Sequence, residues 1–335
     1  KGASTMFGMA RPLVDTFGRV HRDLRISVTD RCNFRCTYCM PEEGLEWLDR
    51  ADILTFEEIE QLARVMVNTF GVDSIRLTGG EPMVRANLDE LVAKLAALGT
   101  DVAMTTNGST LRRHAQLLKD AGLRRINISL DSLQQDRFLE LTRRDELDTV
   151  LDGIDAAVEA GFEPVKVNCV VMRGINDDEL VDFARFGRDK GVVVRFIEWM
   201  PLDADEGWSN DRVVSQKEIV AAIGEVFPLE PIQRGHEPAQ RFRFLDGKGE
   251  VGVIASVTQA FCGDCDRVRL TAEGQLRNCL FAVDEFDLRT LLRNGATDEE
   301  LAAEIERGVG AKWAGHQIGK VNFIRPHRSM SQIGG

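Results

Sequence analysis

Three cysteines near the start of the sequence have the types and spacing to hold a metal cluster. Cys32, Cys36 and Cys39 form a C-x3-C-x2-C pattern. Iron–sulfur clusters are usually held by four cysteines, so a [4Fe–4S] cube on three thiolates keeps one iron open for an outside ligand. A zinc site needs four ligands, and His21 is too far upstream to supply one from the same turn. Because a disulfide leaves one cysteine over, the triplet favours a cluster.

A second cysteine set repeats this logic near the C-terminus. Cys262 and Cys265 form a C-x2-C pair, and Cys279 adds a third thiol from a more distant segment. Zinc, with His236 or His316 as fourth ligand, is one interpretation of the set. A second cluster, again one ligand short, is the other. The spacing alone leaves both open.

Basic residues on predicted strands point to an anionic ligand. They are Arg25, Arg76, Lys166, Arg195, Arg267 and Arg269. Lys166 and Arg195 interrupt apolar strands that should be covered on both faces, and a buried cation needs an anionic partner. Arg267 and Arg269 alternate along one strand and therefore share a face. Since the guanidinium fork matches phosphate oxygens, these residues predict a polyphosphate substrate.

The elements that must position these residues alternate from Leu24 to about Met200. The predicted strands are 24–29, 74–78, 101–105, 125–130, 164–171 and 192–198. The predicted helices are 55–69, 87–98, 109–121, 146–160 and 177–190. Thr55 and Glu58 predict a capping box, and Asn176 predicts an N-cap. Repeated β-α units predict a parallel sheet, and six units are too few for a closed eight-stranded barrel, so the expectation is a partial (β/α)6 barrel of the α/β class.

The alternation stops after Pro201, which predicts a smaller α+β domain at the C-terminus. It begins with an acidic loop at 202–212 and a helix at 215–227. A hairpin around a Gly-Lys-Gly turn follows, with strands at 240–246 and 250–257. Two more helices, at 284–293 and 297–311, lead to a tail at 315–335. The chain is therefore predicted to consist of an unpatterned lead-in (1–19), the barrel (20–212) and a domain that carries the second cysteine set (213–335).

Bulk properties exclude several classes of protein. The 335 residues are 43% hydrophobic, which is enough for a large core. No apolar run of about 18 residues occurs, so no membrane span is expected. No signal-peptide pattern is present and the cysteines suit a reducing compartment, so a cytoplasmic location is expected. The net charge of −12 argues against binding to nucleic acid.

Taken together, the motifs resemble the radical S-adenosylmethionine (radical SAM) superfamily and, within it, the GTP 3′,8-cyclase family of molybdenum-cofactor biosynthesis. The second resemblance runs from about Arg19 to the terminal Gly334-Gly335 pair. It rests on six stretches: 23–41, 75–82, 165–168, 195–200, 261–270 and 334–335. One departure is Ser74, where the family often has a lysine.

The resemblance implies a ligand for each group of residues. Two [4Fe–4S] clusters are expected on Cys32, Cys36, Cys39, Cys262, Cys265 and Cys279. S-adenosylmethionine is expected at Tyr38, Gly79, Gly80, Glu81, Ser129 and Met200. GTP is expected at Arg25, Arg76, Thr105 (or its neighbour Thr106), Lys166, Arg195, Arg267 and Arg269. The Gly334-Gly335 tail is expected to help shape the cavity.

The resemblance also implies an activity and partners. The expected reaction converts GTP to (8S)-3′,8-cyclo-7,8-dihydroguanosine 5′-triphosphate by a radical mechanism. A one-electron donor such as a flavodoxin or ferredoxin and a downstream pyranopterin-forming enzyme are the expected partners, and a homodimer is allowed. Two alternatives stay open: a radical SAM enzyme that modifies a peptide, and a non-enzymatic iron–sulfur or zinc protein. A peptide substrate does not need the basic strand residues.

Overall fold

Six parallel strands form the centre of the molecule. The computed structural model describes residues 10–43, 45–202, 207–321 and 323–334. The strands are β1 (Asp23–Ser27), β2 (Ser74–Thr78), β3 (Asp101–Thr106), β4 (Arg125–Ser129), β5 (Val165–Val171) and β6 (Val193–Glu198). Each pairs in parallel with the next. The predicted α/β partial barrel is confirmed.

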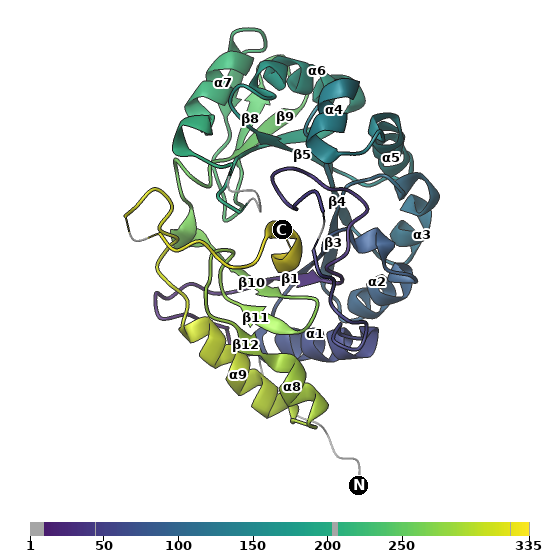
Figure 1. Cartoon of the computed structure of the whole chain (residues 1–335), viewed down its shortest axis with the longest axis vertical. Helices are drawn as coiled ribbons and strands as arrows, with labels where there is room; N and C mark the ends of the chain where they lie inside the picture. The colour runs from purple at the N-terminus through teal and green to yellow at the C-terminus, as the bar shows by residue number, and fades with distance from the viewer. Residues whose placement is uncertain (1–9, 44, 203–206, 322, 335) are drawn as a thin grey trace.

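Helices cover the outside of these strands, as Figure 1 shows. They are α1 (Phe56–Phe70), α2 (Leu88–Ala96), α3 (Ala115–Asp120), α4 (Gln135–Thr142), α5 (Leu147–Glu159) and α6 (Leu180–Lys190). Short 3-10 turns lie between them: η1 (Pro82–Val84), η2 (Leu111–Arg113) and η3 (Asp177–Glu179). Within the described chain, every helix is too short or too polar to span a bilayer.

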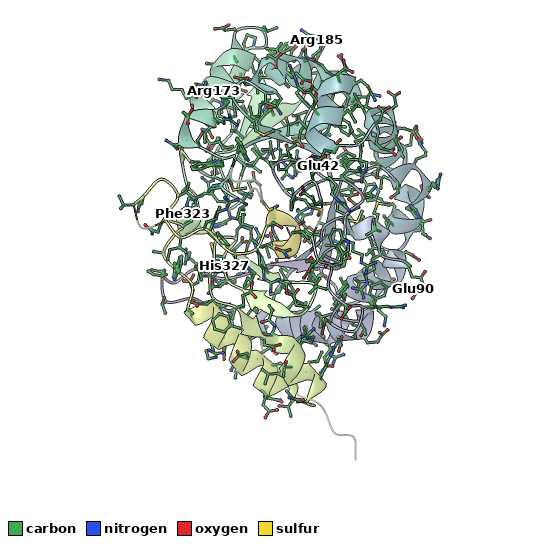
Figure 2. All side chains as sticks on the ribbon, viewed as in Figure 1. Glu42, Glu90, Arg173, Arg185, Phe323 and His327 are labelled. Carbon is green, nitrogen blue, oxygen red and sulfur yellow. The ribbon has the colours of Figure 1, made fainter. Side chains whose placement is uncertain are left out.

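Side chains fill the space between the layers. Apolar residues of the strands and of the inner faces of the helices form one large core cluster. Charged side chains such as Glu90 on α2 and Arg185 on α6 lie on the outside of the ring (Figure 2). This separation is what the amphipathic patterns predict, because apolar burial drives the packing of helix on sheet.

Both predicted N-cap residues lie at helix starts, Thr55 before α1 and Asn176 before η3, but only Thr55 makes the cap hydrogen bonds. The capping box of Thr55 and Glu58 is present at the start of α1. Asn176 makes no cap hydrogen bond. Instead its Oδ1 accepts from the Met172 N–H at 2.8 Å and its Nδ2 donates to the Asp131 carbonyl at 2.8 Å. The amide joins two loops, which is a tertiary role that a sequence pattern does not show.

Two further helices differ from expectation. The predicted helix 109–121 is divided into η2 and α3 at His114. The short α4 was not predicted, because Phe138, Leu141 and Thr142 are its only buried residues within the described chain. Three such positions are too few for a periodic signal.

The C-terminal region adds strands to both edges of the central sheet. The remaining strands are β7 (Leu229–Pro231), β8 (Gln240–Phe244), β9 (Glu250–Ile254), β10 (Arg267–Leu270), β11 (Gln275–Arg277) and β12 (Phe286–Asp287). β9 pairs in parallel with β6, and β10 pairs in parallel with β1. The sheet order is β12-β11-β10-β1-β2-β3-β4-β5-β6-β9-β8-β7. The predicted β8–β9 hairpin is confirmed. The division of the chain at residue 212 stays a prediction. One continuous sheet contains strands from both sides of that boundary.

The last elements are short helices and 3-10 turns of the C-terminal region. They are η4 (Asn210–Arg212), α7 (Gln216–Gly224), η5 (Cys262–Asp264), α8 (Leu288–Arg293), α9 (Asp298–Gly310) and α10 (Met330–Ile333). The described segment before β1 packs against the rest of the fold, although its sequence shows no helix or strand pattern. Asp15 and Arg19 form a buried ion pair of 2.6 Å, and the Arg19 guanidinium donates to the Cys262 carbonyl at 2.7 Å. The part of the predicted lead-in at 1–9 lies outside the described residues.

Two adjacent glycines, Gly79 and Gly80, let the segment after β2 lie directly against the first cysteine loop. The Gly80 N–H donates to the Thr29 carbonyl and the Glu81 N–H donates to the Arg31 carbonyl, both at 2.8 Å. A β-carbon on Gly80 would lie 2.4 Å from the Arg31 oxygen. The close approach that glycine permits here is therefore between two segments of this chain.

We expect Gly80→Ala to destabilise the protein. The added methyl group collides with backbone, which cannot rotate away, so the free energy of unfolding should fall by about 1–3 kcal/mol. Urea unfolding of the metal-free chain measures this change. The control is Gly310→Ala at the end of α9, where an added β-carbon meets open space and the effect should stay within about 1 kcal/mol. Equal stabilities for the two variants would contradict the packing argument.

Candidate functional site

One cavity of about 470 Å³ lies against the inner face of the parallel strands. Every residue expected to hold a cluster, S-adenosylmethionine or GTP lines it: Arg25, Cys32, Cys36, Tyr38, Cys39, Arg76, Gly79, Gly80, Glu81, Thr105, Ser129, Lys166, Arg195, Met200, Cys262, Cys265, Arg267, Arg269 and Cys279. The structure therefore brings together residues that are up to 254 positions apart, from Arg25 to Cys279.

The three cysteines of the first set are partly buried in the cavity wall. Burial raises the pKa of Cys32 to about 11 and that of Cys39 to about 12. Burial and then the neighbouring Cys39 raise the pKa of Cys36 well above its ordinary value. Thiols with raised pKa values hold their protons until a metal replaces them. The donor set therefore fits a cluster that binds three thiolates.

The second cysteine set lines the same cavity in a more cationic setting. Burial raises the pKa of Cys262. Burial also acts to raise the pKa of Cys265, but the charges of Arg267 and Lys312 outweigh it and lower that pKa to about 7. A thiol with a lowered pKa is more readily a thiolate ligand.

The spacing of these thiols bears on the choice between zinc and a cluster. Among the described residues, no three His, Cys, Asp or Glu side chains converge closely enough to hold a single metal ion. One zinc ion would bring its sulfur ligands within about 4 Å of one another. A four-iron cube offers a separate iron to each thiolate and so accepts wider spacing.

Two buried carboxylates lie beside the first set. The Tyr38 hydroxyl donates to Asp131 Oδ2 at 2.6 Å, and burial raises the pKa of Asp131 to about 6. Glu81 accepts from the Thr106 hydroxyl at 2.7 Å and from the Asn107 N–H at 2.6 Å, and burial raises its pKa to about 7. Sequence reasoning missed Asp131, although an aspartate directly after a strand end is a usable signal.

The partners of Glu81 separate the two candidate threonines. Thr106 donates its hydroxyl to Glu81. The hydroxyl of Thr105 instead accepts from Asn127 Nδ2 at 3.5 Å. Asn127 is the register partner of Lys166 on β5. Thr105 therefore faces the basic part of the cavity, as expected for a substrate-side residue.

Three arginines form a row across adjacent strands. Arg25 on β1 is in register with Arg269 on β10 and with Arg76 on β2. Burial and then Arg25 lower the pKa of Arg76 to about 9, and the same two causes lower that of Arg269 well below its ordinary value. Arg76 Nε and Nη1 and Arg25 Nε are buried without hydrogen-bond partners in the described structure. Neighbouring like charges and unpaired donors both cost free energy, so this row requires an anion.

A second basic group continues the row toward β6. Burial and then Arg195 lower the pKa of Lys166 to about 8. Asn168 Oδ1 accepts from Arg195 Nε at 3.0 Å and from Nη2 at 2.7 Å, which holds the guanidinium in place. Gly252 is the register partner of Arg195, and a β-carbon there would lie 3.2 Å from Arg195 Cγ. Sequence reasoning missed Asn168 and Gly252, because only strand register reveals them.

Arg125 is a further basic residue that the sequence reasoning missed. It lines the cavity from the start of β4. Its Nη2 donates to the Ser74 hydroxyl at 3.1 Å and lies 2.6 Å from Asp101. Ser74 stands where the family often has a lysine. The structure thus supplies a cation from the neighbouring part of the sheet beside that position.

The end of the chain enters the centre of the ring, where α10 lies in Figure 1. Arg269 Nη1 donates to the Gly334 carbonyl at 2.7 Å. Gly334 has φ +81, and a β-carbon there would lie 2.7 Å from Thr78 Oγ1. Both the left-handed backbone and the close approach require glycine. Gly335, the other residue of the expected tail, lies outside the described residues.

Glu198 is a buried residue that connects β6 to the segment before the second cysteine set. It is fully buried, and its Oε2 accepts from the Val257 and Thr258 N–H groups, each at 2.8 Å. Its other oxygen accepts from the Gln216 N–H at 3.2 Å. This carboxylate fixes the chain that leads to Cys262.

Comparisons with known proteins show the family and the fold of this chain. Residues 26–187 match the Radical SAM superfamily, and residues 192–318 match the family model described as Molybdenum Cofactor Synthesis C. Among solved structures, native anSMEcpe with bound AdoMet has a TM-score of 0.59 at 17% identity, covering 85% of this chain and 82% of that chain. Streptococcus suis SuiB also has a TM-score of 0.59, at 11% identity, covering 83% of this chain and 63% of that chain. These two likenesses support the fold.

Curated relatives are much more similar. A GTP 3′,8-cyclase of Rhodopirellula baltica is 49% identical over 96% of this chain and 92% of that protein. One of Streptomyces coelicolor is 49% identical over 97% of each. Identity at this level over nearly the whole length shows common descent and a common fold. The chain therefore belongs to the GTP 3′,8-cyclase family of the radical SAM superfamily.

Proposed function

We propose that this chain converts GTP to (8S)-3′,8-cyclo-7,8-dihydroguanosine 5′-triphosphate, an early step in the biosynthesis of the molybdenum cofactor. The observation that carries the proposal is the row of register-aligned arginines, in which Arg25 and Arg76 keep buried N–H groups without partners in the described structure, in a cavity that also contains both cysteine sets. A triphosphate supplies the negative charge that this row lacks. Because the whole chain has a net charge of −12, a group of cations in one cavity indicates a binding site for an anion there.

Membership of the radical SAM superfamily implies one [4Fe–4S] cluster and S-adenosylmethionine. Cys32, Cys36 and Cys39 would hold that cluster, with the cofactor beside Tyr38 and Gly80. When bound and reduced, this pair supplies a 5′-deoxyadenosyl radical that removes a hydrogen atom from the substrate. The second cluster, which Cys262, Cys265 and Cys279 would hold, is part of our proposal.

The chain itself would bind, orient and enclose the substrate. Arg25, Arg76 and Arg269 would donate to phosphate oxygens in a bidentate manner, and Lys166 would add a point charge. Held by the phosphates at one end and the base at the other, the ribose has little freedom, so C3′ and C8 are kept close together. The α10 segment would exclude water from the reacting atoms. These roles are assigned to residues that line the cavity.

The surroundings of the reaction belong to the same proposal. We infer a cytoplasmic enzyme that receives single electrons from a flavodoxin or ferredoxin and passes its product to a pyranopterin-forming enzyme. A homodimer is compatible with it. The proposed division of the chain keeps the lead-in at 1–19, the barrel at 20–212 and the second-cluster region at 213–335.

Turnover with deuterated GTP tests the reaction directly. With GTP deuterated at C3′, S-adenosylmethionine and a reductant under anaerobic conditions, the deuterium should appear in 5′-deoxyadenosine. Mass spectrometry of the deoxyadenosine measures this transfer, and GTP deuterated at C2′ is the control. Deoxyadenosine that forms equally well without GTP would contradict the proposal and favour another substrate.

Replacing the second cysteine set tests the second cluster. Two cubes predict about eight irons per chain. The variant Cys262→Ala, Cys265→Ala, Cys279→Ala should retain about four irons and still bind S-adenosylmethionine, but form no cyclic product. Iron and sulfide analysis of anaerobically prepared protein measures this, with the corresponding variant at Cys32, Cys36 and Cys39 as the matched control. Zinc instead of iron at the second set of the unmodified chain would disprove that part of the proposal.

Lys166 predicts how GTP affinity depends on pH. Its pKa of about 8, lowered by burial and then by Arg195, means that its ammonium is present below pH 8 and lost as the pH rises through that value. GTP affinity should therefore fall above pH 8, by up to about tenfold per pH unit. Isothermal titration calorimetry measures this. Lys166→Arg should remove the fall, and Lys190→Arg on the surface of α6 should keep it. A fall of the same size in the Lys166→Arg variant would assign the effect to another group.

A further inference from the structure

A buried lysine lies behind the second cysteine set. Lys312 is 4% exposed, and it is not among the described residues that line the cavity. Its Nζ lies 3.6 Å from Cys265 Sγ and donates to the Arg267 carbonyl at 2.9 Å. Lys312 thus approaches the sulfur from within the protein, whereas Arg267 approaches it from the substrate cavity.

A histidine orients this lysine. His21 is fully buried, and its Nε2 lies 3.1 Å from Asp15 Oδ2. Because that carboxylate can only accept, Nε2 carries the proton and Nδ1 is an acceptor. Lys312 Nζ lies 3.4 Å from His21 Nδ1 and fills this acceptor. Asp15, His21 and Lys312 therefore form one chain of hydrogen bonds that ends at the Cys265 sulfur.

The same segment fastens the backbone around the cysteine set. Asp15 forms its ion pair with Arg19 at 2.6 Å. Arg19 in turn donates to the Trp313 carbonyl at 2.6 Å and to the Ala314 carbonyl at 2.9 Å. These residues follow Lys312 directly in the chain. The ammonium is thus held by its own side-chain contacts and by the fixed backbone next to it.

The charge of Lys312 has no carboxylate partner. Among the described residues, Lys312 makes no ion pair with Asp or Glu, and Asp15 is shared by Arg19 and His21. A buried ammonium is costly unless an anion lies beside it. The nearest group that can become an anion is the Cys265 sulfur, once it binds iron as a thiolate. The geometry therefore matches an ammonium with a metal-bound thiolate.

We propose that Lys312 is a positioning residue for the second cluster, where it donates a hydrogen bond and a positive charge to the Cys265 sulfur. Hydrogen bonds to cluster sulfurs and nearby charge both change the reduction potential. A cation favours the one-electron-reduced cluster, since that form carries one more negative charge. This inference rests on the proposed second cluster, and it gives a role to the buried side chains of Asp15 and His21.

Reduction of the second cluster tests the inference in the full-length chain with both clusters loaded. Dithionite supplies the single electron, and electron paramagnetic resonance follows the signal of the second cluster, which S-adenosylmethionine does not change. Lys312→Met should shift the reduction equilibrium at least tenfold toward the oxidised form, equivalent to about 59 mV for one electron. Lys312→Arg should keep the potential of the unmodified chain. Lys312→Gln, which keeps a donor but no charge, should fall between them.

Each outcome decides between the alternatives. An unchanged potential in Lys312→Met with about eight irons would disprove the role of Lys312 while leaving the second cluster in place. The absence of any second-cluster signal in the unmodified chain would instead disprove the proposed cluster itself. If Lys312→Met folds but loses about four irons, recovery of that iron in Lys312→Arg supports the proposal, because charge is what the two variants do not share. Loss of iron in both variants would overturn it.

Discussion

The arrangement of buried like charges is the constraint on which the rest of this structure depends. Arg269, Arg25 and Arg76 lie side by side because their three strands are in register; Arg269 and Arg76 are buried, and Arg25 is partly buried. Strand register fixes the three Cα atoms next to one another, so the three cations extend from neighbouring positions. The free-energy cost must be met by the rest of the core and is recovered when an anion binds. The site is thus preorganised for a polyanion before any ligand arrives.

The sheet topology explains how one cavity contains both cysteine sets. The first set lies in the loop after β1, which two glycines fasten to the end of β2. The second set lies next to β10, the strand that pairs with β1 on its other side. Both sets are therefore anchored to the same central strand, although more than 220 residues separate Cys39 from Cys262. The C-terminal region completes the site rather than forming an appendage to it.

Much of the fold and site could be predicted from the chain alone, and the failures have specific physical reasons. Strands and long helices were found because apolar periodicity reflects burial directly. Asn176 failed as an N-cap because its amide satisfies loop backbone from two other segments. Arg125 and Gly252 were missed because nothing in their local sequence differs from an ordinary strand. Their importance comes from the residues opposite them, Arg195 for Gly252 and Ser74 for Arg125.

The sequence by itself determined the chemistry that is available: two sets of three thiols, a group of cations on strands and a glycine pair after β2. Covalent identity and short-range spacing are local properties, so they survive in a linear string. Only the tertiary structure decided which groups meet. Strand register aligned the arginines, parallel pairing brought β10 to β1, and burial left Lys312 with the Cys265 sulfur as its partner. Those pairings depend on the whole sheet, because each strand's position is set by all of its neighbours.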